Sequence, residues 1–206
     1  MSSPTHPSEA TPTARPGLRL SAVPMLPMPV ALVGSEQDGR PNFMAAGWVT
    51  QVNAAPPLLA VAIRPSRLTA EAVQAAGCFS LGFPRGEQAA LADYCGVVSG
   101  RDRDKAAHFT LFRGETGAPM AAECPLNFDC RLVQTLELPT HTLFIGEVVA
   151  AYGDEACLSE GRPDFQRMDP LVLTGDGRYW RLGDVAGQAF RDGFELAKKE
   201  DGDAHA

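Results

Sequence analysis

Short apolar runs separated by turn residues follow one another along most of the chain. Apolar runs of about four to eight residues bounded by Gly, Pro, Asn and Asp are typical of strands. Asp38-Gly39 and Asp176-Gly177 each stand between two such runs, and Asp-Gly predicts a hairpin turn because Gly tolerates a positive φ. The strands that we expect are Pro29–Gly34, Gly47–Val52, Leu58–Ile63, Cys78–Phe83, Phe128–Leu138, Thr142–Ala151, Leu171–Thr174 and Arg178–Leu182.

A few helices are expected between these strands. Thr69–Ala76 has Thr69 as a candidate N-cap and Gly77 as a C-terminal stop. A second helix is expected at about Glu87–Cys95, and a short third one near Asp102–His108. Because long helices do not alternate regularly with the strands, a doubly wound parallel sheet is disfavoured. The pattern predicts a mainly β fold, either a barrel or a sandwich, with flanking helices.

Length and charge narrow the class of protein further. The 206 residues suit one domain, which we expect over residues 18–195, between a disordered N-terminal tail at 1–17 and a C-terminal tail at 196–206. The net charge of -7 argues against nucleic acid, whose phosphates need a basic face, but leaves a phosphate-bearing cofactor open. With no apolar stretch of about 18 residues, no membrane span is expected.

The cysteine pattern points to a reducing compartment. The chain has five cysteines, an odd number, and no two of them have C-x-x-C spacing. This pattern disfavours a disulfide framework and a zinc site, so we expect reduced thiols, a cytoplasmic protein and no metal.

Two segments in the first third of the chain could hold a ligand. In Arg40–Thr50, small residues would let a flat ring approach the backbone, and Asn42 could hydrogen-bond the edge of a heterocycle. The alternative is an ordinary hairpin with Trp48 in the core. Arg64–Thr69 joins a strand to a helix start, where free N–H groups favour an anion, although Thr69 could simply cap its helix.

Two later segments also carry candidate chemistry. Gly96–Lys105 combines a glycine hinge with mixed charges, and is either a solvated loop or a source of contacts to an anion from Ser99, Arg101 and Lys105. His141 lies in a turn between two long strands and is either structural or a donor to a carboxamide, since histidine titrates near neutrality. The hydrolase, P-loop and dinucleotide-binding motifs are absent.

The order of these segments, over about Leu20 to Phe190, resembles the flavin reductase-like, FMN-binding split-barrel family. Within the family the chain is most similar to the flavoredoxins, whose S-G-R-D-x-D-K segment matches Ser99–Lys105. Each motif alone is weak, whereas their joint order and spacing are specific. The matching segments are Pro29–Val33, Gly39–Asn42, Ala46–Trp48, Pro56–Leu58, Thr69, Phe79–Leu81, Ser99–Asp102, Asp104-Lys105, His141 and Gly146–Val148.

This resemblance implies a six-stranded Greek-key split β-barrel that forms a homodimer, with FMN near the subunit interface. It implies an oxidoreductase that passes electrons from NAD(P)H or a redox protein through FMN to a flavin or another acceptor, with a redox protein or a monooxygenase as possible partner. The alternatives are a non-enzymatic FMN electron carrier, a sensory or structural protein with an altered pocket, and an enzyme similar to pyridoxamine-phosphate oxidases.

The resemblance also assigns site residues. His141 corresponds to the nicotinamide side of related reductases and is the candidate catalytic residue, although many of them have G-D-H where this chain has Pro-Thr-His. The candidate cofactor-binding residues are Asn42, Phe43, Met44, Ala45, Ala46, Gly47, Trp48, Thr50, Arg64, Ser66, Arg67, Thr69, Ser99, Gly100, Arg101 and Lys105.

Overall fold

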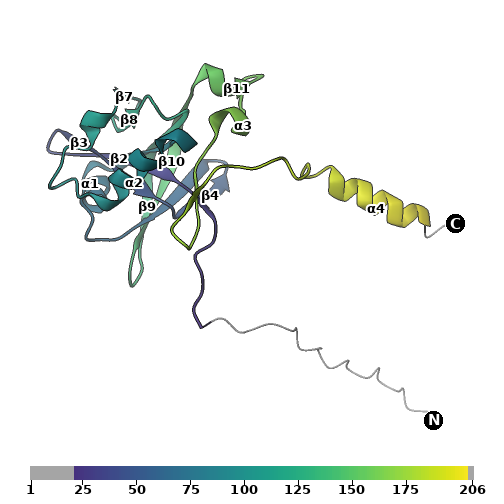
Figure 1. Ribbon diagram of the computed structural model, residues 1–206. Coiled ribbons are helices and arrows are strands. Elements are labelled where there is room, and N and C mark those ends of the chain that lie inside the picture. Colours follow the sequence, from purple (N-terminus) through teal and green to yellow (C-terminus); the bar gives the residue numbers. More distant parts are fainter. Residues whose placement is uncertain (1–20, 204–206) are drawn as a thin grey trace, which may run out of the picture.

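The computed structural model describes residues 21–203 of the chain. The expectation of a disordered tail at residues 1–17 lies outside this range. Within it, one seven-stranded antiparallel sheet dominates, with the strand order β3-β2-β6-β9-β10-β5-β4 (Figure 1). Its strands are β2 (Ala31–Gln37), β3 (Arg40–Ala46), β4 (Val49–Ala54), β5 (Pro57–Ile63), β6 (Cys78–Phe83), β9 (Leu126–Glu137) and β10 (Thr142–Gly153).

The two edge strands of this sheet are consecutive in the chain. β3 and β4 are joined directly through Gly47 and Trp48, so the chain passes from one edge of the curled sheet to the other. Within residues 21–203, β3 and β4 do not pair with each other, so the barrel is split between them. The expected split barrel is confirmed. The expected six strands become seven because Gly47 and Trp48 divide one passing segment into two.

The hairpin between β2 and β3 was partly predicted. Asp38 and Gly39 form its turn with φ of 52° and 74°, and Gln37 pairs with Arg40, as Asp-Gly indicated. Strand β3 itself was not predicted, because its polar start, Arg40 to Asn42, is typical of a turn. Pro41 is tolerated there because β3 is an edge strand, where a missing N–H breaks no ladder hydrogen bond.

Two helices pack against the sheet, and both were predicted to within a few residues. α1 (Leu68–Ala76) ends at Gly77 in the left-handed conformation, as expected. The expected N-cap was wrong: the capping residue is Arg67, and Thr69 is buried inside the first turn. α2 (Ala89–Val97) follows the 3-10 turn η1 (Gly86–Gln88), and the expected third helix is the 3-10 turn η2 (Ala106–His108).

The remaining elements are short and surround the main sheet. No helix within residues 21–203 is both long and apolar enough to cross a membrane. The helix α4 (Asp192–Asp203) crosses the expected tail boundary and lies apart from the sheet (Figure 1). The other elements are β1 (Met28–Pro29), β7 (Leu111–Arg113), β8 (Pro119–Ala121), η3 (Glu155–Cys157), β11 (Leu158–Ser159), β12 (Arg162–Pro163), α3 (Phe165–Met168), β13 (Val172–Leu173) and β14 (Tyr179–Trp180).

Strand β2 is buried on both faces and separates two apolar clusters. Val33 belongs to the cluster inside the barrel, which α1 completes with Ala70 and Val73. Its neighbour Leu32 points the other way, because successive side chains of a strand alternate between faces. The second cluster lies between β2, β3 and α2, and contains Leu32, Phe43, Ala92, Cys95, Phe109 and Leu171.

Replacing Gly34 in β2 by Ala should destabilise the protein. A Cβ at Gly34 would stand 2.1 Å from the backbone oxygen of Pro119 and 2.2 Å from Ser80 Oγ, so backbone must move. Overpacking of this kind costs roughly 1–3 kcal/mol or more, which urea unfolding would measure. Gly193→Ala in α4, where nothing lies within 4 Å, is the matched control and should not lower stability. Equal unfolding midpoints for the two variants would contradict the close packing at Gly34.

Candidate functional site

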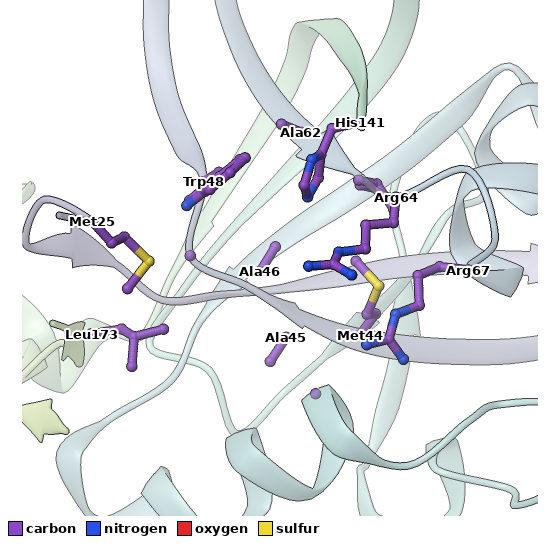
Figure 2. A pocket seen from close by; sticks show the side chains of 13 residues that line it. Met25, Met44, Ala45, Ala46, Trp48, Ala62, Arg64, Arg67, His141 and Leu173 are labelled. Carbon is purple, nitrogen blue, oxygen red and sulfur yellow. The ribbon is translucent and has the colours of Figure 1, made fainter. Parts of the chain in front are cut away.

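A cleft of about 350 Å³ opens where the barrel is split (Figure 2). Gly47 and Trp48 lie at the crossing from β3 to β4, and the end of β5 forms the neighbouring wall. Met25 and Leu173 close one side, while Arg64 and Arg67 stand on the other (Figure 2). The complete lining is Met25, Met44, Ala45, Ala46, Gly47, Trp48, Ala62, Ile63, Arg64, Arg67, Gly96, His141 and Leu173.

The lining of this cleft suits a flat ring with a polar edge. Ala45, Ala46 and Gly47 carry almost no side chain, so a ring can lie close to the backbone. Because β3 is a sheet edge, every second N–H and C=O of it points away from its partner strand and can hydrogen-bond a ligand. An apolar cleft with backbone donors along one side therefore matches a heteroaromatic group.

The rings of Trp48 and His141 form a tilted pair at the mouth of the cleft. Their ring centroids are 4.4 Å apart at an interplanar angle of 38°, and Thr140 Oγ1 lies 2.9 Å from His141 Nδ1. Partial burial lowers the pKa of His141 below its ordinary value, and the positive charge of Arg64 lowers it further. The lowered pKa favours the neutral imidazole, whose ring packs against the indole of Trp48.

A second, smaller pocket of about 140 Å³ adjoins the cleft and shares Met44 and Arg67 with it. Three cationic side chains line it, and no carboxylate does. It lies between the first turn of α1 and the loop that follows α2. The lining is Asn42, Met44, Ser66, Arg67, Leu68, Thr69, Val98, Ser99, Gly100, Arg101 and Lys105.

Lys105 contributes a buried amine to the lining of this pocket. Its residue exposure is only 3%, and its Nζ donates to the carbonyl oxygens of Cys95 at 3.0 Å and Val98 at 3.1 Å. These carbonyls end α2, where the helix dipole favours a cation. Burial lowers the pKa of Lys105, and the charge of Arg67 lowers it as well. None of the ion pairs found among residues 21–203 involves Lys105, so its charge is offset by dipoles alone.

The start of α1 contributes neutral donors to the same pocket. No side chain caps the start of α1, so the N–H groups of Leu68 and Thr69 stay available to an anion, whereas the N–H of Ala70 donates to the backbone oxygen of Arg67. Thr69 is 1% exposed, and its Oγ1 accepts a 3.0 Å hydrogen bond from Asn42 Nδ2. Cations, a helix N-terminus and a hydroxyl thus converge on one small volume, as phosphate recognition requires.

Arg101 ties the two halves of this pocket together. Its guanidinium donates to the backbone oxygen of Ser66 at 3.2 Å and pairs with Glu71 on α1. Gly100 is needed beside it, because a Cβ there would stand 2.2 Å from Asn42 Oδ1. The loop after α2 therefore forms one wall of the pocket at Ser99 and Gly100, while residues 101–104 are exposed.

Most of the candidate residues named from the sequence meet around these two pockets. Phe43 and Thr50 do not: Phe43 is 1% exposed and packs against Phe109 in the second core, while Thr50 is exposed on β4. Sequence reasoning missed Met25 and Leu173, which flank the cleft (Figure 2). No local pattern marks them, because they approach only when β1 pairs with β13.

Comparison with known proteins agrees with this geometry. The family model described as "Flavin reductase like domain" matches residues 23–180. The crystal structure of flavoredoxin from Methanosarcina acetivorans is 45% identical, covering 89% of this chain and 100% of that one, with a TM-score of 0.84. Flavoredoxin of Desulfovibrio vulgaris (Miyazaki F) is 34% identical, covering 86% and 99%, with a TM-score of 0.81. A flavin reductase (NADH) from Kitasatospora aureofaciens is 30% identical over 169 residues, 79% of this chain and 76% of that one.

The chain therefore belongs to the flavin reductase-like domain family, and its fold is the split barrel of that family. Its closest likeness among these three proteins is to the flavoredoxin from Methanosarcina acetivorans, in sequence and in structure. The resemblance expected from the order of the motifs is confirmed.

The titration of His141 tests the electrostatics at the mouth of the cleft. Because its pKa is lowered in the folded state, NMR of the ring Cε1–H should show a midpoint below the ordinary value of about 6.5. As the pH falls, the unfolded chain takes up this proton before the folded protein does. The stability that the neutral His141 contributes is therefore present above about pH 6.5, the ordinary pKa, and is lost as the pH falls through the lower pKa of the folded state. Arg64→Leu should raise the midpoint without restoring it fully, because burial is the larger cause. A midpoint unaffected by Arg64→Leu would show that the guanidinium does not act on this ring; a His141→Gln variant assigns the signal.

Proposed function

We propose that this protein binds FMN across the two adjoining pockets and acts as an oxidoreductase. The observation that carries the proposal is their juxtaposition: an apolar cleft edged by backbone donors opens directly beside a small cationic pocket, and Met44 and Arg67 line both. A ligand that fills both must carry a flat ring at one end and an anion at the other. FMN has this shape, and membership of the flavin reductase-like family supports the choice.

The residues present fit the two ends of FMN. Backbone from Met44 to Trp48 would hold the ring against the split in the barrel. Arg67, Lys105 and the start of α1 would hold the phosphate, whose charge of about -2 at neutral pH needs cations and dipoles of this kind. The absence of any carboxylate from the lining of the small pocket removes the repulsion that would otherwise oppose a dianion.

When bound, FMN supplies the redox chemistry of its ring, which accepts and delivers hydride or single electrons. The side chains of this chain orient the ring and limit the access of water. Trp48, whose residue exposure is 44%, covers the open side of the cleft together with His141. In the proposed reductase, the neutral His141 donates a hydrogen bond to the carboxamide of NAD(P)H, and the electrons pass to a second flavin, a redox protein or a monooxygenase partner.

A non-enzymatic FMN electron carrier is the second candidate. It is favoured by the high similarity to two flavoredoxins and by Pro139-Thr140-His141, which departs from the G-D-H of many reductases. The two functions differ in their substrates. A reductase turns over many equivalents of free FMN or FAD with NADH or NADPH, whereas a carrier exchanges electrons only with another protein.

We also propose a homodimer in the cytoplasm. From Thr50 to Ala54 every residue of the edge strand β4 is exposed, and the apolar Val52 among them is 48% exposed. A sheet edge that is exposed on both faces and carries apolar side chains is a pairing surface. Trp48, which directly precedes β4, and its neighbour His141 both line the cleft. A second copy of the protein packed against β4 would therefore border the cleft. Unpaired thiols at all five cysteines suit a reducing compartment.

The binding of FMN is tested by titration and by spectroscopy. The purified protein should show flavin absorbance, and the apoprotein should take up FMN more tightly than riboflavin. Lys105→Met keeps the packing of the side chain and removes its charge, so FMN affinity should fall about 10- to 100-fold, as for loss of one charge-assisted contact. Riboflavin affinity should hardly change.

The matched control for this variant is Lys198→Met, which removes an exposed lysine from α4. It should leave both affinities as they are. A colourless protein that takes up no FMN would overturn the proposed function. With FMN bound, steady-state assays with NADH, NADPH and reduced ferredoxin, each with and without excess free flavin, distinguish the reductase from the carrier. No reduction by any of these donors would overturn the reductase.

A charged substitution on the exposed sheet edge should separate the dimer. Val52→Glu should shift the mass measured by light scattering from twice 21.9 kDa to 21.9 kDa, because an apolar contact would have to bury a charge. Leu111→Glu, on the small β7–β8 hairpin and 38% exposed, is the control and should stay dimeric. A wild-type protein of 21.9 kDa would contradict the homodimer.

A further inference from the structure

The hydrogen bond between Asn42 and Thr69 lies behind the anion pocket and has a fixed direction. Asn42 is 5% exposed and Thr69 is 1% exposed, and 3.0 Å separates Asn42 Nδ2 from Thr69 Oγ1. An amide nitrogen donates and cannot accept, so the threonine oxygen is the acceptor here. The hydrogen of the Thr69 hydroxyl is therefore left for a different acceptor.

The orientation of the Asn42 amide is held by Gly100. The other amide atom, Oδ1, is buried and accepts no hydrogen bond. A Cβ at Gly100 would stand only 2.2 Å from it, so this oxygen lies against the Cα of Gly100. A carbonyl oxygen can accept a weak Cα–H contact, whereas an NH₂ group would press its hydrogens against those of the glycine. The contact with Gly100 thus directs the nitrogen of Asn42 towards Thr69.

We propose that Asn42 is a positioning residue that fixes the Thr69 hydroxyl as a donor to the phosphate of the bound cofactor. Thr69 lines the anion pocket, and the hydrogen bonds found in residues 21–203 give its hydroxyl no acceptor within the protein. A buried donor without an acceptor costs free energy, which a phosphate oxygen in the pocket would recover. Asn42 acts through Thr69 and does not itself touch the phosphate. This inference rests on the proposed function.

Two variants separate this role from a structural one. Asn42→Asp keeps the shape of the side chain but can only accept, so it turns the Thr69 hydroxyl inward and away from the phosphate. Thr69→Val keeps the shape of threonine and removes the hydroxyl. Each should weaken FMN binding about 10- to 100-fold, the range for one hydrogen bond to a charged group. Riboflavin, which lacks the phosphate, should bind each variant within about threefold of the wild type, well below that range.

Calorimetric titration of the wild type, both single variants and the double variant, each with FMN and with riboflavin, tests the proposal. The double variant should bind FMN no more weakly than Thr69→Val alone, because Asn42 has nothing left to position. Thr69→Ser should recover most of the affinity that Thr69→Val loses. A carboxylate that simply repels the phosphate would instead give losses that add, and additive losses would overturn the proposal.

Asn127→Asp makes the same chemical change at another buried asparagine, remote from both pockets, whose Nδ2 donates to the backbone oxygens of Ala121 and Cys124. It should lower thermal stability and leave the ratio of FMN to riboflavin affinity unchanged. If Asn42→Asp lost affinity for FMN and for riboflavin by equal factors, the positioning role would be overturned. If Asn42→Asp does not fold, an unchanged FMN affinity in Thr69→Val would overturn it. A wild type that binds neither ligand would overturn the proposed function itself.

Discussion

The two edge strands of the sheet, β3 and β4, are joined by Gly47 and Trp48 but do not pair with each other. The chain crosses from one edge to the other at these two residues, and the barrel is split there. The rest of the site depends on that constraint. The split leaves a cleft, exposes backbone donors along β3, and sets Trp48 at its mouth beside the turn that carries His141.

The electrostatics of the second pocket depend on one buried cation. Lys105 is held by the last carbonyls of α2, which are strong enough acceptors to keep a lysine inside the protein but carry no full charge. A carboxylate at this position would stabilise the lysine more strongly, but it would also neutralise the positive charge of the pocket. Offsetting the charge with dipoles alone leaves the pocket attractive to an external anion, at some cost in stability.

The sequence indicated the fold through its strands and turns. Asp38-Gly39 and Gly77 were identified from their backbone requirements, and their positive φ angles agree. Strand β3 was missed because its start, Arg40 to Asn42, is polar and contains Pro41, which is typical of a turn. Thr69 was assigned as a cap because its residue type suits a helix start, whereas it lies two residues after the N-cap Arg67, inside the first turn, where it is buried against Asn42. Met25 and Leu173 carry no local signal, since only the pairing of two remote strands brings them to the cleft.

The end of α2 touches both pockets at once. Gly96 lines the apolar cleft, Val98 lines the anion pocket, and the carbonyl oxygens of Cys95 and Val98 hold Lys105. A single turn of helix therefore borders both pockets, and in the proposed function it would lie beside the ring of FMN on one side and beside its phosphate on the other.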